Sequence, residues 1–449
     1  MTLRIEDLLI VNARVVTMND TWDVVDGSVL IRDGRIVAVG VADTERSGSS
    51  LETIDAGGSY VLPGFIQTHI HLCQTLFRGS ADDLPLLAWL KQRVWPLEAA
   101  HTDDTLRVAA RLAAAELLAG GTTTVLTMET VHGTDAVCDA LVDTGLRAIV
   151  GKCLMDIDGA QPARLKQSAQ AGIDETLALH RRWHDAANGR IRIAFAPRFA
   201  ISCTPDLLRL TAEAAEAHGL LVHTHASEQR EEIEVVRQAT GMDNMAYLAS
   251  VGLATPRLCA AHCVWVTDAE QAMMAERAVK VLHCPSSNMK LGSGIAPVPE
   301  MRARGISVSL GADGAACSNT LDMFQEMRLA ATLQAMRLGP GHLTARDAVT
   351  MATREGARAL GLDHEVGSLE PGKKADLIVV GRDAPHQQPA LDPYTTLVYA
   401  TRSSDVRYTL VDGVVVARDG RAVWADPPAL IAQAREAAAT LRDRALRYT

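Results

Sequence analysis

Residues 60–71 are Tyr60-Val61-Leu62-Pro63-Gly64-Phe65-Ile66-Gln67-Thr68-His69-Ile70-His71, an apolar stretch that ends in two histidines. This pattern predicts a single strand that has both histidines at its carboxyl end. Because successive side chains of a strand alternate between its faces, His69 and His71 point the same way and can hold one ion between them. A His-x-His pair also occurs by chance, so the metal hypothesis depends on the rest of the chain.

Strand-like and helix-like segments alternate through residues 61–360. The predicted strands are 64–69, 123–128, 147–152, 192–197, 220–225, 258–262, 279–283 and 307–312. The clearest helical patterns are 105–119, 134–144, 205–218, 268–277 and 321–337. Eight such alternations favour a (β/α)8 barrel over a doubly wound parallel sheet, although periodicity alone leaves both open.

The two ends of the chain have a different texture, with short strands and tight turns. Strands are predicted at 8–17, 27–31, 35–41 and 52–55, and again at 375–380, 406–411 and 414–417. Asp33-Gly34 and Asp412-Gly413 separate apolar runs, which is a hairpin signal. We therefore expect an α/β protein with a small β-sandwich domain (residues 1–60 plus 361–425), a catalytic barrel (61–360) and a C-terminal helix (426–449).

Composition narrows the class of partner. The chain has 449 residues, 48% of them hydrophobic, and a formal net charge of −10 without a basic run. This argues against nucleic acid or an anionic membrane as a partner and favours a small-molecule substrate. Charges occupy residues 1–7, where a signal peptide would need an apolar run, so we expect a cytoplasmic protein. The eight scattered cysteines are expected to be buried thiols rather than disulfides.

Polar residues close several of the predicted barrel strands, at the end where barrel enzymes keep their sites. Two histidines, a third one and a carboxylate would leave the open position that catalytic zinc requires. His225 is the better third ligand, because His223 shares its face but should lie deeper, as a hydrogen-bonded core histidine. His283 closes another strand and is either a site residue or structural.

Three further side chains have predicted roles in the chemistry of the site. Asp313 follows an apolar strand, where a carboxylate is costly unless it binds a cation, and it can also take a proton from a metal-bound water. Glu228, three residues beyond His225, can carry protons between that water and a substrate nitrogen, or can simply begin a solvated helix. His262 is a further ligand or a donor that polarises the intermediate, and we favour the donor.

Together these motifs resemble the amidohydrolase superfamily, in its branch of metal-dependent deaminases and chlorohydrolases. The resemblance covers nearly the whole chain. It runs from residues 61–71 through His223-Thr224-His225-Ala226-Ser227-Glu228, His283-Cys284-Pro285-Ser286-Ser287-Asn288 and Gly311-Ala312-Asp313-Gly314 to residues 367–377.

The resemblance implies one divalent ion, Zn²⁺ first and Fe²⁺ as the alternative, held by His69, His71, His225 and Asp313. No lysine ends the fourth strand, where relatives with two metals have one, so a single metal is implied. Glu228 would be the proton shuttle and His262 would contact the nucleophile and the substrate. Many relatives are dimers or tetramers, so a homo-oligomer is expected.

The substrate is implied by a segment that resembles the pocket roof of adenosine-type members, which deaminate S-adenosylhomocysteine, 5′-methylthioadenosine and 5′-deoxyadenosine. There Glu98 would hold the ribose hydroxyls, and Trp89 would stack on the base or pack in the core. Lys152 and Arg198 replace an arginine and a histidine of those members, and Arg198 would aim its planar fork into the pocket. Arg164 matches a second arginine that grips the substrate tail.

The leading hypothesis is therefore a hydrolytic deaminase of a 5′-modified adenosine. The alternative is an aminohydrolase or chlorohydrolase of a free heterocycle such as 8-oxoguanine, a pterin or an s-triazine. Glu228 favours deamination, because ammonia needs a proton to leave and halide does not. A homologue that binds metal without catalysis, and a cyclic-amide hydrolase, are further alternatives.

Overall fold

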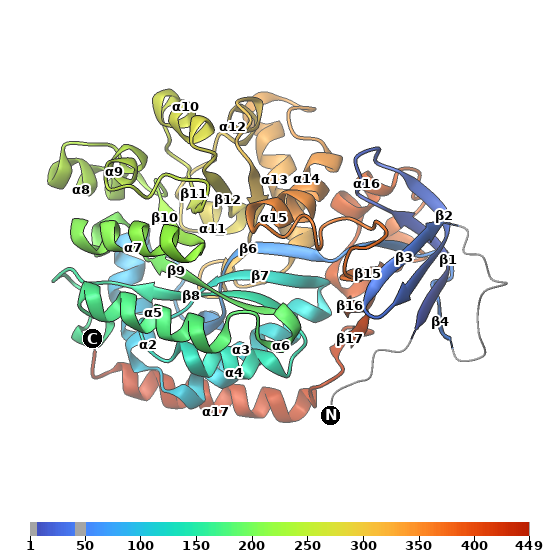
Figure 1. The fold of residues 1–449 in the computed structure, drawn as a ribbon, viewed down its shortest axis with the longest axis horizontal. Coiled ribbons are helices and arrows are strands. Elements are labelled where there is room, and N and C mark those ends of the chain that lie inside the picture. The colour runs from blue at the N-terminus through green and yellow to red at the C-terminus, as the bar shows by residue number, and fades with distance from the viewer. Residues whose placement is uncertain (1–6, 41–50, 449) are drawn as a thin grey trace.

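The computed structural model describes residues 7–40 and 51–448, and these form two separate sheets surrounded by helices (Figure 1). Residues 1–7 and the predicted strand 35–41 fall partly outside this range, since residues 1–6 and Val41 are not described. In the part of the chain that is described, no helix is long and apolar enough to cross a membrane.

The first sheet is parallel throughout and its strand order follows the sequence. The order is β13-β12-β11-β10-β9-β8-β7-β6-β14. The bounds are β6 Phe65–His71, β7 Thr122–Met128, β8 Arg147–Leu154, β9 Ile191–Pro197, β10 Val222–Ala226, β11 Leu258–His262, β12 Lys280–His283, β13 Val308–Leu310 and β14 Asp313–Gly314. All eight predicted barrel strands are confirmed within two residues, except that the last one is interrupted after Leu310.

The interruption after Leu310 lets one stretch of chain join the two ends of the sheet. β13 pairs with β12 and β14 pairs with β6, yet only Gly311 and Ala312 separate β13 from β14 in the chain. The two ends of the strand order are therefore adjacent, and the sheet is curled as in a TIM-like barrel. Residue 311 must be glycine, because a Cβ there would lie 2.5 Å from the carbonyl oxygen of His69.

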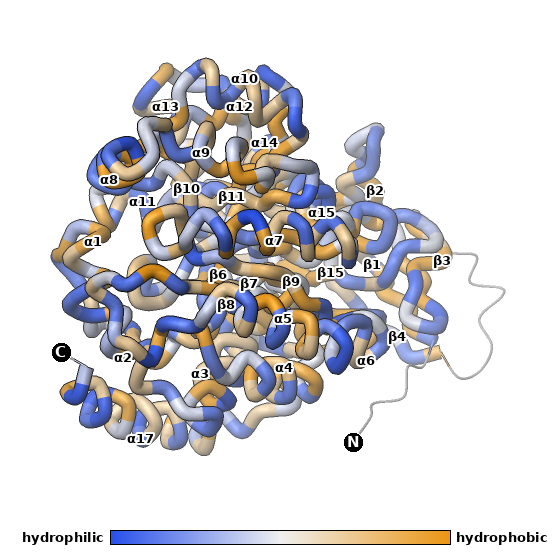
Figure 2. Tube along the Cα trace, turned by 60° about the vertical axis from the view of Figure 1, so that its left-hand side comes forward, coloured by the Kyte–Doolittle hydropathy of each residue, from blue (hydrophilic) through white to orange (hydrophobic). Residues whose placement is uncertain are grey.

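Helices follow the strands and cover the curled sheet from outside. They are α3 Asp103–Ala119, α4 Thr134–Val142, α5 Ala169–Trp183, α7 Pro205–His218, α8 Arg230–Thr240, α9 Asn244–Ser250, α10 Asp268–Glu276, α11 Pro285–Lys290, α12 Val298–Ala303, α13 Met323–Leu338, α14 Ala345–Ala352 and α15 Arg354–Ala359. Each mixes hydrophobic and hydrophilic residues (Figure 2), as expected of helices that bury one face. The five predicted helices are confirmed, and α5, α8, α9, α11, α12, α14 and α15 were not predicted.

A second sheet lies beside the barrel and combines both ends of the chain (Figure 1). Its order is β18-β17-β16-β15-β5-β1-β2-β3, with β4 beside β1. The bounds are β1 Leu8–Val16, β2 Val24–Arg32, β3 Arg35–Gly40, β4 Glu52–Asp55, β5 Tyr60–Pro63, β15 Leu377–Val380, β16 Val406–Val411, β17 Val414–Arg418 and β18 Arg421–Ala422. These strands pair as one sheet, so the two-layered sandwich and the domain boundaries stay predictions.

Both predicted hairpin turns are confirmed. Asp33-Gly34 joins β2 to β3 and Asp412-Gly413 joins β16 to β17, and all four residues have positive φ, between 47° and 74°. Two consecutive residues with positive φ make the type I′ turn, whose twist suits antiparallel strands and which favours Asp-Gly.

The prediction of one strand across residues 60–71 is wrong. The chain leaves β5, in the small sheet, at Gly64 and enters β6, in the barrel. A Cβ on Gly64 would lie 2.2 Å from side-chain atoms of Thr123, so only glycine lets the chain cross between the sheets here. Alternation of apolar residues could not reveal this, since both strands are buried throughout.

The C-terminal helix α17 (Pro427–Ala445) confirms the helix predicted there and runs along the barrel beneath α3 and α4 (Figure 1). Leu441 and Ala445 of α17 share an apolar cluster with Trp89 and Trp95, and Arg444 donates a hydrogen bond to the carbonyl oxygen of Ala100. The last helix thus supports the segment of residues 86–100. That segment comprises α1 Leu86–Trp89, the π-helix η3 Leu90–Val94 and α2 Trp95–Ala100.

Candidate active site

A bulge in β6 turns its two histidines into the barrel. Ile66 pairs with Thr124 of β7, but Ile70 pairs with Thr127, so β6 has one residue more between the two pairs. Ile66 therefore packs in the barrel interior while Ile70 packs outward against the helices. Without the extra residue, strict alternation from Ile66 would direct His69 and His71 away from the interior.

The predicted metal ligands meet at one point. One potential ligand atom from each of His69, His71, His225 and Asp313 lies within 4.8 Å of all the others. Oδ1 of Asp313 is 3.3 Å from Nε2 of His69 and 3.2 Å from Nε2 of His71, and the latter is 3.3 Å from Nε2 of His225. Strands β6 and β10, from distant parts of the chain, and Asp313 at the start of β14 thus build one cluster.

The other ring nitrogens fix which atom each histidine presents. Nδ1 of His71 donates to the carbonyl oxygen of Met128 at 2.8 Å, and Nδ1 of His225 donates to that of Arg198 at 2.6 Å. Nε2 of each ring is then unprotonated, and its lone pair faces the cluster. Nε2 of His69 is buried and has no hydrogen-bond partner among the residues that the structure describes.

A divalent ion fits this donor set. Three imidazole nitrogens and one carboxylate oxygen are ligands that zinc accepts, and four protein ligands can still expand to admit water. Burial lowers the pKa of His69 to about 4 and that of His225 well below its usual value. Both rings are therefore neutral near pH 7, which is the form that binds a metal.

Two residues of this region adopt strained backbone conformations. Asp313 and His262 both have positive φ, 60° and 71°. Non-glycine residues rarely do so, and such strain persists where the surrounding structure enforces it, often at functional sites. The left-handed turn at Asp313 brings its carboxylate back over the strand ends, toward the histidines.

The two oxygens of Asp313 face different partners. Oδ1 lies against His69 and His71, whereas Oδ2 accepts a 2.7 Å hydrogen bond from the Ser287 hydroxyl and lies 3.9 Å from Nε2 of His262. Burial would raise the pKa of Asp313, but His69 and His71 outweigh it and hold the pKa well below its usual value. One oxygen can bind an ion while the other handles a proton.

Glu228 and His262 lie beside this carboxylate. Oε2 of Glu228 is 3.6 Å from Nε2 of His262, and Oε1 accepts a 3.2 Å hydrogen bond from the hydroxyl of Ser293. Nδ1 of His262 lies 2.8 Å from Oδ1 of Asn288, which leaves Nε2 facing the cluster. Burial raises the pKa of Glu228, and the charges of Glu228 and Asp313 outweigh burial to raise that of His262.

A cavity with an empty volume of about 340 Å³ opens onto the cluster. It has a polar floor and an apolar roof, and its lining is His71, His225, Glu228, His262, Asp313, Arg198, Leu86, Trp89, Leu90, Phe199 and Leu291. Leu86, Trp89 and Leu90 come from α1 and η3, so the predicted roof segment does cover the cluster. The indole nitrogen of Trp89 has no hydrogen-bond partner among the described residues.

The remaining predicted substrate residues lie in three different settings. Glu98 is buried beside the cavity and paired with Arg198. Lys152 faces outward from β8, where its ammonium contacts Gln167 and lies 3.6 Å from Glu175. Arg164 is exposed and donates to the carbonyl oxygen of His101. Lys152 and Arg164 are therefore not brought to the cavity, and their predicted role stays a prediction.

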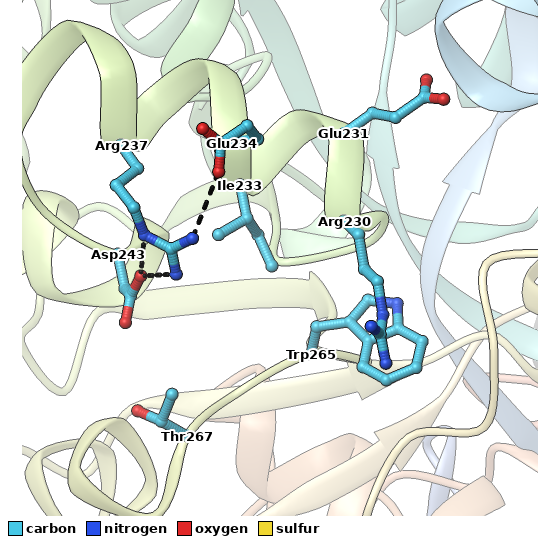
Figure 3. A pocket seen from close by; sticks show the side chains of 8 residues that line it. All are labelled: Arg230, Glu231, Ile233, Glu234, Arg237, Asp243, Trp265 and Thr267. Carbon is cyan, nitrogen blue, oxygen red and sulfur yellow. Dashed lines mark hydrogen bonds and ion pairs between the residues drawn. The ribbon is translucent and has the colours of Figure 1, made fainter.

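A larger hollow, with an empty volume of about 890 Å³, lies on the surface beside α8. In Figure 3, Arg237 pairs with Glu234 and Asp243, and Arg230 lies over the ring of Trp265 at 4.0 Å. It contains none of the cluster residues, so size alone does not identify the site.

The sequence did not reveal several residues that hold the site together. Ser287 and Asn288 follow a predicted strand end, so their position was a usable signal for their contacts with Asp313 and His262. Ser293 lies 65 positions from Glu228, and no local pattern links the two. Gln74, which donates to Glu98, sits three residues beyond the His-x-His pair without a distinguishing motif.

Comparison with known proteins agrees with this geometry. The profile of the Amidohydrolase family matches residues 60–416. A 5-methylthioadenosine/S-adenosylhomocysteine deaminase of Symbiobacterium thermophilum is 41% identical over 441 residues, 97% of this chain and 99% of that protein. A 5′-deoxyadenosine deaminase of Methanothermobacter thermautotrophicus is 40% identical over 437 residues, 97% and 99% of the two chains.

Among solved structures, an adenosine deaminase of Xanthomonas campestris with bound zinc has a TM-score of 0.91 and 33% identity, covering 97% of this chain and 99% of that one. The likeness thus extends over both sheets and the site between the strand ends and the roof. With its profile match, its full-length relatives and a His-His-His-Asp cluster inside a curled parallel sheet, the chain belongs to the amidohydrolase family.

Proposed function

We propose that the protein is a metal-dependent hydrolytic deaminase that removes the exocyclic amine of an adenine nucleoside, a 5′-modified adenosine, as ammonia. The observation that carries the proposal is the meeting of Glu228, His262 and Asp313 beside the metal-type cluster, under an apolar roof. A buried carboxylate outside the ligand set is what proton delivery to a substrate nitrogen requires.

A divalent ion held by His69, His71, His225 and Asp313 would lower the pKa of a water ligand and so supply a nucleophile near neutral pH. Zinc is our first choice, because the donor set suits it and a structural relative was solved with it. Iron stays the alternative.

The chain's own residues would then move the protons. Oδ2 of Asp313, turned away from the ligand atoms, takes a proton, and the Ser287 hydroxyl, which donates a hydrogen bond to this oxygen, holds the carboxyl group in place. Glu228 lies outside the ligand set, and burial raises its pKa, which favours the protonated form that can deliver a proton to a ring nitrogen. Nε2 of His262 lies between these two carboxylates and can hold the developing oxyanion.

The roof suits a flat, apolar base. Trp89 offers an aromatic face, and Leu86, Leu90, Phe199 and Leu291 exclude water from the same cavity. The names of the full-length relatives point to adenine nucleosides with varied 5′ groups. We infer that this chain has the same substrate class and acts as a homo-oligomer, which stays a prediction.

The test is ammonia release by the zinc-loaded protein on adenosine, 5′-deoxyadenosine, 5′-methylthioadenosine, S-adenosylhomocysteine, guanine, 8-oxoguanine, isoxanthopterin, cytosine and melamine. The matched pair of variants is Glu228→Gln and Glu231→Gln, because Glu231 is exposed at the start of α8, three residues away. We expect turnover of the 5′-modified adenosines, a loss of about 10²–10⁴-fold in Glu228→Gln and little change in Glu231→Gln.

A second candidate is hydrolysis of a free heterocycle, and one observation favours it. Glu98, the predicted acceptor for ribose hydroxyls, already accepts hydrogen bonds from Arg198 and Gln74. Activity on a free base together with silence on every nucleoside would reject the nucleoside proposal and support this candidate.

A further inference from the structure

Glu98 and Arg198 form a buried, two-point ion pair at the side of the cavity. Nη1 of Arg198 donates to Oε2 of Glu98 at 2.7 Å, and Nη2 donates to Oε1 at 3.2 Å. Only 2% of the Arg198 side chain and 1% of the Glu98 side chain are exposed. Nε2 of Gln74 donates a third hydrogen bond, to Oε1 of Glu98 at 3.0 Å.

These contacts leave Glu98 little capacity for a substrate. A carboxylate offers about four acceptor positions, and a ribose diol would need two of them. Three hydrogen bonds from Arg198 and Gln74 already use most of that capacity. If Glu98 turned to the sugar, the Arg198 guanidinium would lose its counter-charge in a buried place, which is unfavourable.

Arg198, in contrast, lines the cavity, and Glu98 is not among the lining residues. A guanidinium has five N–H donors, and the pair with Glu98 uses two. The backbone of Arg198 has a separate task, since its carbonyl oxygen accepts the hydrogen bond from Nδ1 of His225. Changes to the side chain can therefore affect the substrate without removing the support of the metal ligand.

We propose that Arg198 is the residue that contacts the substrate and that Glu98 is a positioning residue that acts through it. The pocket wall then presents N–H donors and selects hydrogen-bond acceptors, the oxygens of a sugar or a ring. It does not select hydroxyl donors, as a free carboxylate would. This inference deepens the proposed function and rests on it for the identity of the amine that is released.

The test is a double-mutant cycle with Glu98→Gln, Arg198→Met and the double variant, measured as KM and kcat on 5′-deoxyadenosine. If Glu98 acts through Arg198, each single change raises KM by about tenfold or more, as expected for loss of hydrogen bonds to a charged group. The double variant should then be no worse than Arg198→Met alone. A KM in the double variant that multiplies both single effects would mean that Glu98 binds substrate independently, and would overturn the proposal.

Two controls separate this result from general damage. Arg192→Met removes another paired arginine, at the start of β9 and so at the end of the strand opposite to Arg198, where it contacts Glu365 and Asp185, and KM should not change. Bound zinc and the melting temperature are measured for every variant. If Glu98→Gln does not fold, Gln74→Met replaces it, with a smaller rise in KM that also disappears when Arg198 is methionine.

The two proposals fail differently. If wild-type protein releases ammonia only from a free base, the proposed nucleoside activity is rejected, and the same cycle on that base still tests the roles of Glu98 and Arg198. If nucleosides are turned over and the single effects multiply, the activity stands and only the positioning role of Glu98 is rejected.

Discussion

Nε2 of His223 lies 2.6 Å from Nδ1 of His69 in the barrel interior, and Nδ1 of His223 lies 3.1 Å from the carbonyl oxygen of Thr127. The carbonyl can only accept, so Nδ1 of His223 carries the proton and Nε2 accepts from His69. His69 must then carry its proton on Nδ1, which leaves Nε2 free for the ion. His223 thus sets the tautomer of a predicted metal ligand from below, and the two rings stay neutral because burial lowers the pKa of both.

This relationship predicts the effect of removing His223. His223→Asn should weaken zinc binding by about 10–100-fold, since the partner of a metal-bound histidine orients it and raises its basicity. A chelator competition measures the affinity. His101→Asn is the matched control, because His101 is equally buried and hydrogen-bonded to Thr105 and Cys73 but lies outside the cluster. Equal zinc affinity in wild type and His223→Asn would contradict the prediction.

Removal of the metal should lower stability as well as activity. An ion that binds only the folded chain adds about 2.7 kcal/mol when its free concentration is 100 times its dissociation constant. Dialysis against a chelator should therefore abolish ammonia release and lower the melting temperature, and zinc should restore both. Asp313→Asn protein should respond much less to zinc in the same thermal scan. A melting temperature that does not depend on zinc in wild type would argue against the cluster as a metal site.

Ser293 should tune the proton shuttle. Burial raises the pKa of Glu228 and the Ser293 hydrogen bond lowers it, so Ser293→Ala should raise that pKa further. A hydrogen bond to a charged group contributes about 1.5–3 kcal/mol, so its loss should favour the protonated form of Glu228. We expect the Glu228 limb of the pH profile of kcat/KM to move upward. Ser307→Ala, which loses a hydroxyl bonded to Glu355 at a partly buried position, is the control; identical profiles for all three proteins would refute the role.

Glu365 should stabilise the fold in a pH-dependent way. Burial would raise its pKa, but hydrogen bonds from Arg192 and Lys374 lower it to about 2. A depressed carboxyl pKa stabilises the folded state above the unfolded pKa, and this contribution is lost as pH falls toward the folded pKa. With allowance for solvent screening, Glu365→Gln should cost about 1–2 kcal/mol at pH 7.

Urea denaturation of Glu365→Gln at pH 7, 5, 4 and 3 measures this contribution. The stability difference from wild type should be constant down to about pH 5 and shrink toward pH 3. Glu213→Gln, at an exposed position of α7, should show no such change. A difference that grows as pH falls would have the wrong sign for this ion-pair network.

Local patterns predicted the barrel strands well, because a buried parallel strand is a short apolar run. A polar residue at its carboxyl end indicates a site residue, since barrel enzymes keep their sites there. His225, His262 and Asp313 were found in this way. Helix α8 was not predicted, because its first turn, Arg230-Glu231-Glu232, is charged and only Ile233 and Val236 are buried in its apolar face. The substrate-binding role of Lys152 was predicted from the resemblance to relatives. Alternation along β8 instead directs its side chain outward, toward α5.

The sequence by itself determined the residue types and spacings that metal chemistry needs. Strand periodicity alone predicts that the two histidines of His-x-His share one face and that Asp313 lies at a strand end. Tertiary structure decided everything that depends on contacts between distant segments. The break at Gly64, the bulge that turns His69 inward, the His223–His69 relay and the Arg198–Glu98 pair join residues up to 154 positions apart. Their geometry comes from closure of the sheet and packing of the roof, which no local pattern encodes.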